Sequence, residues 1–291
     1  MNVLNNYLLP EGNVQIAFSG GRTSAYMLHQ ILEANGGLPD RAKVVFTNTG
    51  REMPETLDFV QEVSNRWSVP IVWVEYRCQF TGAPHNPSQK VFDSAAHTFE
   101  VVSHNSASRN GEPFVNVMRY FQYPPNREAD FCSHELKTRT ARRYCVNQLG
   151  WEHWTSAIGI RGDESNRALK KQPKERYKVW YPLIDACVTK RDVSAFWRGQ
   201  NFDLRLSNIN GVTPLGNCDG CFKKSELKRA ALARDFPDRA SWWSEQELRF
   251  GGYFRENTSW ADLIDYVEKQ GDWIFDAEDA FCQAGDGECT G

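Results

Sequence analysis

Apolar runs alternate with helical stripes over the first part of the chain. Residues 14–18, 43–47 and 71–75 are short apolar runs, which are typical of strands buried on both faces of a sheet. Between the first two runs, residues 23–34 place apolar side chains at helical spacing. A second helix is predicted to begin at Pro54, because a helix does not need the N–H of its first residue. This order predicts an α/β fold with a parallel sheet covered by helices.

The same alternation returns after residue 130. A basic helix is predicted over 132–147 and a buried strand over 154–160. Thr189 and Asp192 have the spacing of a capping box, so a further helix is expected to begin there. We therefore expect a Rossmann-like parallel sheet with helices on both faces.

The C-terminal part of the chain differs in character. It contains a Cys-x-x-Cys turn, two predicted helices near 225–234 and 260–270, and an acidic, glycine-rich tail. We expect an α/β domain over 1–210, which contains an irregular insertion at about 82–128. A mostly helical extension that carries the Cys-x-x-Cys turn is expected over 211–291.

Composition narrows the classes of partner. The chain has 291 residues, of which 34 are basic and 37 acidic, so its formal net charge is −3. This balance gives no overall electrostatic case for binding nucleic acid or membranes. Because no apolar run reaches the length of a membrane span and no signal peptide is recognisable, a cytoplasmic protein without a membrane partner is expected. In that reducing compartment the eight cysteines are expected to be ligands, nucleophiles or buried small residues.

A glycine-rich turn links the first predicted strand to the first predicted helix. Its glycines let the backbone approach a ligand closely, and the N–H groups at a helix start attract anions. Hydroxyl side chains can add donors, and the guanidinium of Arg22 is expected either near the phosphates or in solvent. The turn lacks the endings of the Walker and dinucleotide-binding motifs. The residues predicted to bind phosphates are Ser19, Gly20, Gly21, Arg22, Thr23 and Ser24.

A polar loop follows the second predicted strand. Such loops lie at the carboxyl edge of an open α/β sheet, where ligands bind. Asn48, Thr49, Gly50 and Glu52 can therefore reach a ribose or adenine. Alternatively, these residues form an ordinary turn ahead of the helix at Pro54.

A second polar loop follows the predicted strand at 154–160. Arg161 and Arg167 suit phosphate or sulfate, because a guanidinium binds such oxyanions in bidentate fashion. Asp163 and Glu164 can hold Mg²⁺ through water, or they orient the arginines. The alternative is an exposed loop of salt bridges without a ligand.

Three cysteines are candidate metal ligands. Cys218 and Cys221 have ligand spacing, and thiolates suit zinc or an iron–sulfur cluster. Without a metal, the Cys-x-x-Cys would be only a turn. Cys132 lies far from this pair in the sequence and joins it only through the resemblance described next.

Four blocks, in the same order, resemble the phosphoadenosine phosphosulfate (PAPS) reductase family of the PP-loop ATP pyrophosphatase and adenine nucleotide α-hydrolase superfamily. The resemblance covers roughly residues 14–235 and implies an adenine nucleotide as ligand, either ATP or (phospho)adenylylsulfate. The blocks are 19–24, 46–52 with 54–56, 132–137, and 159–165 with Arg167.

The resemblance also implies roles for single residues. A similar arginine loop closes on the nucleotide in related reductases, so Arg161 inherits that role. Lys137 matches the family's lysine after the cysteine block and is expected to face the phosphates. In the family the region of Cys132 meets the Cys-x-x-Cys turn.

Related reductases bind a [4Fe–4S] cluster through a cysteine pair and a Cys-x-x-Cys. Here Cys132, Cys218 and Cys221 match three of the four positions, because Phe131 replaces one member of the pair. Either one iron stays open, as in related tRNA-thiolating enzymes, or a further cysteine completes the set, and zinc is the alternative metal. The candidate fourth ligands are Cys145, Cys282 and Cys289.

Three functions follow from the resemblance. In the first, ATP adenylates an acceptor, either nucleic acid or a small molecule, and a sulfur taken from a sulfur donor displaces AMP. In the second, (phospho)adenylylsulfate is reduced to sulfite with thioredoxin, and Cys289 is the nucleophile. In the third, the chain is a non-catalytic nucleotide- and cluster-binding subunit of a nucleic-acid modification system. A homodimer is compatible with each of them.

Overall fold

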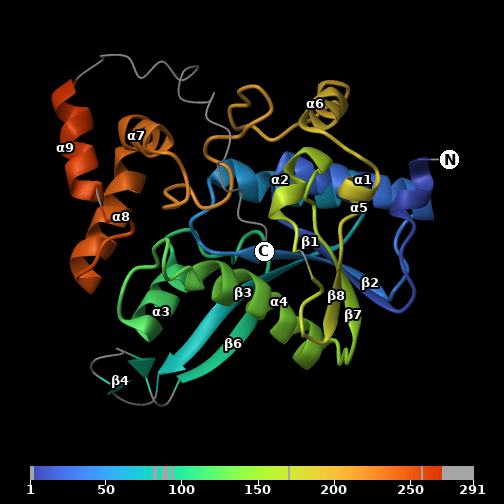
Figure 1. Ribbon diagram of the computed structural model, residues 1–291, viewed down its shortest axis with the longest axis horizontal. Coiled ribbons are helices and arrows are strands. Elements are labelled where there is room, and N and C mark those ends of the chain that lie inside the picture. Colours follow the sequence, from blue (N-terminus) through green and yellow to red (C-terminus); the bar gives the residue numbers. More distant parts are fainter. Residues whose placement is uncertain are drawn as a thin grey trace.

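A twisted sheet runs through the centre of the molecule (Figure 1). The computed structural model describes residues 3–80, 84–86, 91–92, 95–169, 171–256 and 258–270. In this part of the chain the six-stranded sheet has the order β6-β3-β2-β1-β7-β8, and all its pairs are parallel except β3 with β6. The predicted α/β fold is confirmed. The strands are β1 (Asn13–Phe18), β2 (Ala42–Asn48), β3 (Ile71–Phe80), β6 (Ala95–Val102), β7 (Trp154–Ala157) and β8 (Tyr177–Trp180).

One face of the sheet is covered by α1 (Arg22–Asn35), α2 (Pro54–Arg66) and α6 (Lys190–Arg198) (Figure 1). Their apolar side chains share the largest buried cluster of the described residues with Ile16 and Phe46, and α6 packs against α1. α1 ends at Gly36, which takes the left-handed conformation that glycine allows. The predicted capping box of Thr189 and Asp192 is present at the start of α6. These helices bury one face of the sheet.

The opposite face is covered by the continuous helix 133–148. It consists of η2 (Ser133–Arg139), α4 (Thr140–Arg143) and η3 (Tyr144–Gln148), and the two outer parts have the wide π-helical winding. Ala141 and Tyr144 pack on Val45, Val74 and Trp154. Helices therefore lie on both faces, as predicted.

The segment expected as an irregular insertion over 82–128 differs from that expectation where it is described. β6 pairs antiparallel with β3 along eight residues, from Ala95 to Val102. α3 (Glu112–Phe121) then packs against β3. A short antiparallel pair, β4 (Pro84–Asn86) with β5 (Val91–Phe92), lies between β3 and β6 in the sequence. Pairing with a neighbouring strand, rather than local propensity, creates β6.

The C-terminal extension contains α7 (Glu226–Asp235), α8 (Pro237–Phe250) and α9 (Trp260–Gln270), which lie together at one end of the sheet (Figure 1). Trp243, Trp260 and Phe254 form their core and share it with α3. The predicted helical extension is confirmed. Among the described residues, no helix is long and apolar enough to cross a membrane. The remaining short helices are η1 (Val3–Tyr7), η4 (Gly162–Arg167) and α5 (Pro182–Asp185).

Candidate functional site

A cavity of about 550 Å³ lies between the sheet and the helix 133–148. Alternate residues of β1, β7 and β8 form its floor, because side chains on one face of a strand repeat every two residues. At the carboxyl edge of the sheet it reaches the loop 19–24. The floor includes Gln15, Ala17, Trp154, Ser156, Tyr177 and Val179. The helix contributes His134, Lys137, Thr138, Arg139, Ala141 and Arg142.

The loop 19–24 lines the carboxyl end of this cavity. The N–H of Ser19 donates to Ser24 Oγ at 3.2 Å, and Ser24 Oγ donates to the carbonyl oxygen of Gly21 at 2.9 Å. These bonds shape the turn. α1 starts without a side-chain cap, so its first N–H groups suit an anion. Five of the six predicted phosphate-binding residues line the cavity: Ser19, Gly21, Arg22, Thr23 and Ser24.

Gly20 does not line the cavity, but the turn requires it. Its φ is +76°, and a Cβ there would lie 2.7 Å from Thr56 Cγ2. We expect Gly20→Ala to destabilise the fold by about 2–4 kcal/mol, from left-handed strain plus steric overlap, and to weaken nucleotide binding. Urea unfolding and a nucleotide titration measure the two effects.

Gly36→Ala is the matched control for Gly20→Ala. Gly36 also has a positive φ, +64°, but a Cβ there meets nothing within 4 Å. It should therefore cost only the backbone strain, about 1–2 kcal/mol, and leave nucleotide binding unchanged. Equal losses of stability and of affinity in both variants would contradict a special role for Gly20.

Arg22 turns to the protein rather than to solvent. Its guanidinium is bidentate to Asp203, with distances of 2.7 and 2.9 Å, and donates to Thr213 Oγ1 at 2.9 Å and to the carbonyl of Leu206 at 3.0 Å. The side chain is 8% exposed. The solvent-facing alternative for Arg22 is therefore wrong. Its contacts tie the start of α1 to the segments around residues 203–206 and 213.

Of the 159–167 loop, Gly159 and Arg161 line the cavity. Arg161 is 7% exposed, and its Nη1 donates to Thr23 Oγ1 at 3.1 Å. Asp163 and Glu164 both pair with its guanidinium, at 2.9 and 3.1 Å, and Glu164 also pairs with Arg167 at 2.9 Å. The two carboxylates thus orient the arginines, which is one of the two roles expected for them. Asp163, Glu164 and Arg167 do not line the cavity.

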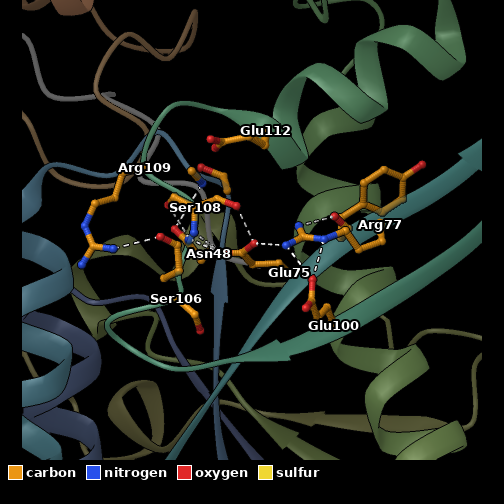
Figure 2. Close-up of polar contacts among 12 residues, drawn as sticks. Asn48, Glu75, Arg77, Glu100, Ser106, Ser108, Arg109 and Glu112 are labelled. Atoms are coloured by element: carbon orange, nitrogen blue, oxygen red, sulfur yellow. Dashed lines mark hydrogen bonds and ion pairs between the residues drawn. The ribbon is translucent and has the colours of Figure 1, made fainter.

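Asn48 lies away from the cavity, in a polar cluster around Glu75 (Figure 2). Its amide nitrogen donates to Glu75 Oε1 at 2.5 Å and to the carbonyl oxygen of Ser108 at 2.8 Å. Its Oδ1 accepts the N–H of Gly50 at 3.1 Å. Glu75 also accepts from Ser108 and pairs with Arg77. Asn48 therefore joins β2 and β3 to the 103–111 loop.

Thr49 and Glu52 connect the same loop to the cysteines. Glu52 accepts both the N–H and the hydroxyl of Thr49, at 3.0 and 2.8 Å, and forms an isolated bridge with Cys218. Thr49 Oγ1 lies 3.2 Å from Cys218 Sγ. Burial raises the pKa of Glu52, and the charge of Lys137 opposes that rise. Of this loop, Glu52 lines the large cavity, whereas Thr49 lines a small one beside it and Gly50 lines neither.

The small cavity is where the three predicted metal ligands meet. Cys132, Cys218 and Cys221 line it together with Lys137, which also lines the large cavity. The structure therefore brings together residues that lie about ninety positions apart, as the resemblance implied. Lys137, whose Nζ lies 3.5 Å from Asn217 Oδ1, is the side chain shared by the two spaces.

The described residues do not complete a metal site. No three His, Cys, Asp or Glu side chains among them are arranged to hold a metal ion. The space between the cysteines is about 10 Å³, barely room for one water molecule. Cys145 lies in the core of the helix-covered face, apart from the other three, and burial raises its pKa to about 12. The other candidate ligands, Cys282 and Cys289, lie outside the described residues.

Asp219, inside the Cys-x-x-Cys turn, is a residue that the sequence did not single out. Its fully buried carboxylate accepts from Arg51 at 2.9 Å and from the indole of Trp243 at 2.8 Å, and pairs with Arg239. The guanidinium of Arg51 lies 4.3 Å above the ring of Trp242. A buried charge needs such partners. In the sequence, only the position of Asp219 between Cys218 and Cys221 indicates that this residue has a special role.

Comparisons with known proteins identify the family of the chain. The family model of the phosphoadenosine phosphosulfate reductase domain matches residues 13–204. The uncharacterized nin region protein ORF290 of Escherichia phage lambda is 32% identical over 221 residues, which cover 76% of this chain and 69% of that protein. The crystal structure of phosphoadenylyl-sulfate (PAPS) reductase from Candida auris, a phosphate complex, overlaps 68% of this chain and 79% of its own, at 15% identity and a TM-score of 0.40, too distant to support an argument. The chain belongs to the phosphoadenosine phosphosulfate reductase domain family, whose activities are enzymatic and related to sulfonucleotides.

Proposed function

We propose that the protein is an ATP-dependent sulfurtransferase, which adenylates an acceptor and then replaces AMP with sulfur. The observation that carries the proposal is the position of Lys137, which lines both the large cavity and the cysteine cavity. A nucleotide on the loop 19–24 would therefore lie next to the thiols. Such an arrangement suits the passage of sulfur to an activated acceptor.

The charge of the large cavity supports a polyphosphate ligand. Cationic side chains outnumber carboxylates among its lining residues, and guanidinium and ammonium groups bind phosphate well. The uncapped start of α1 adds a partial positive charge at the same end. The cations are Arg22, Lys137, Arg139, Arg142, Arg161 and Lys190, and the carboxylates are Glu52 and Glu175. The four arginines are each paired with a carboxylate, on Asp203, Glu135, Glu175 and Asp163 respectively.

The reaction has two balanced steps. An oxygen of the acceptor attacks the α-phosphorus of ATP, the bond to the bridging oxygen breaks, and pyrophosphate leaves with Mg²⁺. A hydrosulfide from the sulfur donor then attacks the acceptor carbon, its proton passes to solvent, the carbon–oxygen bond breaks, and AMP leaves. Where the donor is a persulfide instead, a second thiol must cleave the S–S bond of the adduct, and the two donor sulfurs end as a disulfide. Arg161 and Lys137 would stabilise the negative charge that develops on the phosphates. A nucleic-acid base is one acceptor that this chemistry admits.

A [4Fe–4S] cluster or zinc remains a prediction within this proposal. The donor set of Cys132, Cys218 and Cys221 suits either metal chemically, but the described residues supply no closed site. A bound cluster would hold a sulfur or fix the three thiolates in place. Neither step above depends on it, and metal and sulfide analysis of anaerobically purified protein tests it directly.

ATP labelled in the β-phosphate tests the proposed reaction. With an acceptor fraction present, we expect labelled pyrophosphate rather than labelled ADP, because cleavage falls between the α- and β-phosphates. Lys137→Met should lower pyrophosphate release by at least tenfold, since it removes the charge beside the phosphates. Lys269→Met, on the exposed end of α9, is the control and should have no effect. Release of ADP, or no release with any acceptor fraction, would contradict the proposal.

Reduction of (phospho)adenylylsulfate to sulfite is the second candidate. The match to the reductase domain over residues 13–204 favours it, as does Arg161 at the loop 19–24. Thioredoxin would be the reductant and Cys289 the nucleophile. Sulfite formed from adenylylsulfate, and lost in Cys289→Ser, would establish this function. Pyrophosphate release that is unchanged in Cys289→Ser would favour sulfur transfer.

A further inference from the structure

Two polar side chains interrupt the floor of the large cavity. Gln15 of β1 and Ser156 of β7 are partners in the parallel register, and both line the cavity. They are 7% and 5% exposed. Strands covered on both faces are normally apolar, because a buried polar group is costly unless it is bonded. The bond between them, from Ser156 Oγ to Gln15 Oε1, is long at 3.5 Å.

A third polar group lies one step further along the same face. Trp154 precedes Ser156 by two residues, lines the cavity and stacks on Tyr177, with ring centroids 5.4 Å apart. Its indole Nε1 is buried and has no hydrogen-bond partner within the part of the chain that the structure describes. A donor left in this state costs about 1–3 kcal/mol. This end of the cavity therefore combines aromatic walls with unused hydrogen-bonding capacity.

The two ends of the cavity match the two ends of a nucleotide. The phosphate end carries Lys137 and Arg161, whereas the other end has the aromatic rings of Trp154 and Tyr177 beside the ion pair of Arg142 with Glu175. Ser19, directly after β1, follows Gln15 by four positions, which corresponds to about 13 Å at the usual rise of a strand. The base of a nucleotide whose phosphates lie on the loop 19–24 would thus extend toward Gln15.

We infer that this end of the cavity binds the adenine ring and that Gln15 reads its amino-bearing edge. A glutamine amide can accept from the N6 amino group and donate to a neighbouring ring nitrogen, the bidentate pairing by which glutamine recognises adenine elsewhere. The hydroxyl of Ser156 donates to Gln15 Oε1 and so orients the amide toward the base. The indole N–H of Trp154 is a further donor at this end of the cavity. The inference rests on the proposed binding of a nucleotide, and it moves base recognition from Asn48, whose amide is bonded to Glu75 and Ser108, to the middle of the sheet.

Gln15→Met tests this role, because methionine keeps the length of the side chain and removes both hydrogen bonds. The full chain and the variant are titrated with four probes: ATP; purine riboside triphosphate, which lacks the amino group; adenosine, which lacks the phosphates; and tripolyphosphate, which lacks the base. We expect Gln15→Met to weaken binding of ATP and of adenosine about tenfold. Purine riboside triphosphate should lose less, because it keeps the ring nitrogen but not the amino group, and tripolyphosphate should change less than twofold. Lys43→Met is the matched control, since Lys43 is the register partner of Gln15 on β2 but does not line the cavity. Thermal unfolding confirms that both variants fold.

The outcomes separate this inference from the proposed function. Equal losses for ATP and purine riboside triphosphate, or no loss at all, would overturn the role of Gln15. Wild-type protein that binds tripolyphosphate as tightly as ATP would overturn base recognition but leave the phosphate site intact. Adenosine binding that depends on Gln15, without tripolyphosphate binding, would support the inference and overturn the proposed function. Failure to bind any of the four probes would overturn both.

Discussion

Arg161→Ala should weaken nucleotide binding about 30- to 150-fold. The guanidinium lies within the cavity wall, donates to Thr23 in the loop 19–24, and is held in place by Asp163 and Glu164. A charged hydrogen bond of this kind contributes about 2–3 kcal/mol when it meets a phosphate. Isothermal titration of ATP or adenylylsulfate measures the loss. In this variant Asp163 and Glu164 lose their partner. If water replaces the guanidinium, the midpoint of thermal unfolding without nucleotide should be nearly unchanged.

Two variants serve as controls for Arg161→Ala. Arg161→Lys keeps the charge but loses the planar fork, so it should recover only part of the affinity. Arg191→Ala removes an exposed arginine near the start of α6 and should change the affinity less than twofold. A loss below threefold in Arg161→Ala would mean that Arg161 serves the loop structure rather than the ligand.

Asp219→Ala should lower the free energy of unfolding by about 3–5 kcal/mol, the usual cost of removing one partner from a buried ion pair. The variant leaves Arg51, which is 3% exposed, without its carboxylate, and it also removes the acceptor of the Trp243 indole. Burial already lowers the pKa of Arg51, which shows how poorly solvated its charge is. Urea unfolding followed by tryptophan fluorescence measures the change.

Asp219→Asn and Asp235→Ala define the origin of that effect. Asparagine keeps an acceptor for Trp243 but not the charge, so its loss should be intermediate. Asp235 pairs with Arg234 on the exposed surface, and its removal should cost less than about 0.5 kcal/mol. A change below 1 kcal/mol in Asp219→Ala would show that the carboxylate does not hold the turn.

The parts of the fold that the sequence predicted are those set by local signals. Apolar strands at 14–18, 43–47 and 71–75, the proline that opens α2 and the capping box of Thr189 all lie where expected. β6 was not predicted, because its backbone bonds depend on the register with β3 and its sequence has no strong alternation of its own. The π-helical winding of 133–148 has no local signal either.

The candidate site was predicted best where a motif carries its own geometry. The loop 19–24, Arg161, Lys137 and the three cysteines converge around two adjoining cavities. The loop after β2 was predicted less well, because whether a polar side chain faces a ligand or a neighbouring loop depends on the fold. The amide of Asn48 donates hydrogen bonds to Glu75 and to the carbonyl of Ser108, and both residues are distant from it in the sequence. Gln15 and Ser156 carry no local signal of a site, because each lies inside a strand.

The ion pair between Arg51 and Asp219 also determines where the chain can be truncated. The match to the reductase domain ends at residue 204, which invites truncation near that point. Yet Arg51 belongs to the first half of the chain, and its buried charge is neutralised by a carboxylate that comes after that point. A fragment ending at 204 would expose the apolar side chains that α3 buries against Trp243. It would also leave Arg51 without the carboxylate of Asp219. We therefore expect that the end of the family-model match is not a boundary of autonomous folding, and that fragments for study need to extend at least through α9.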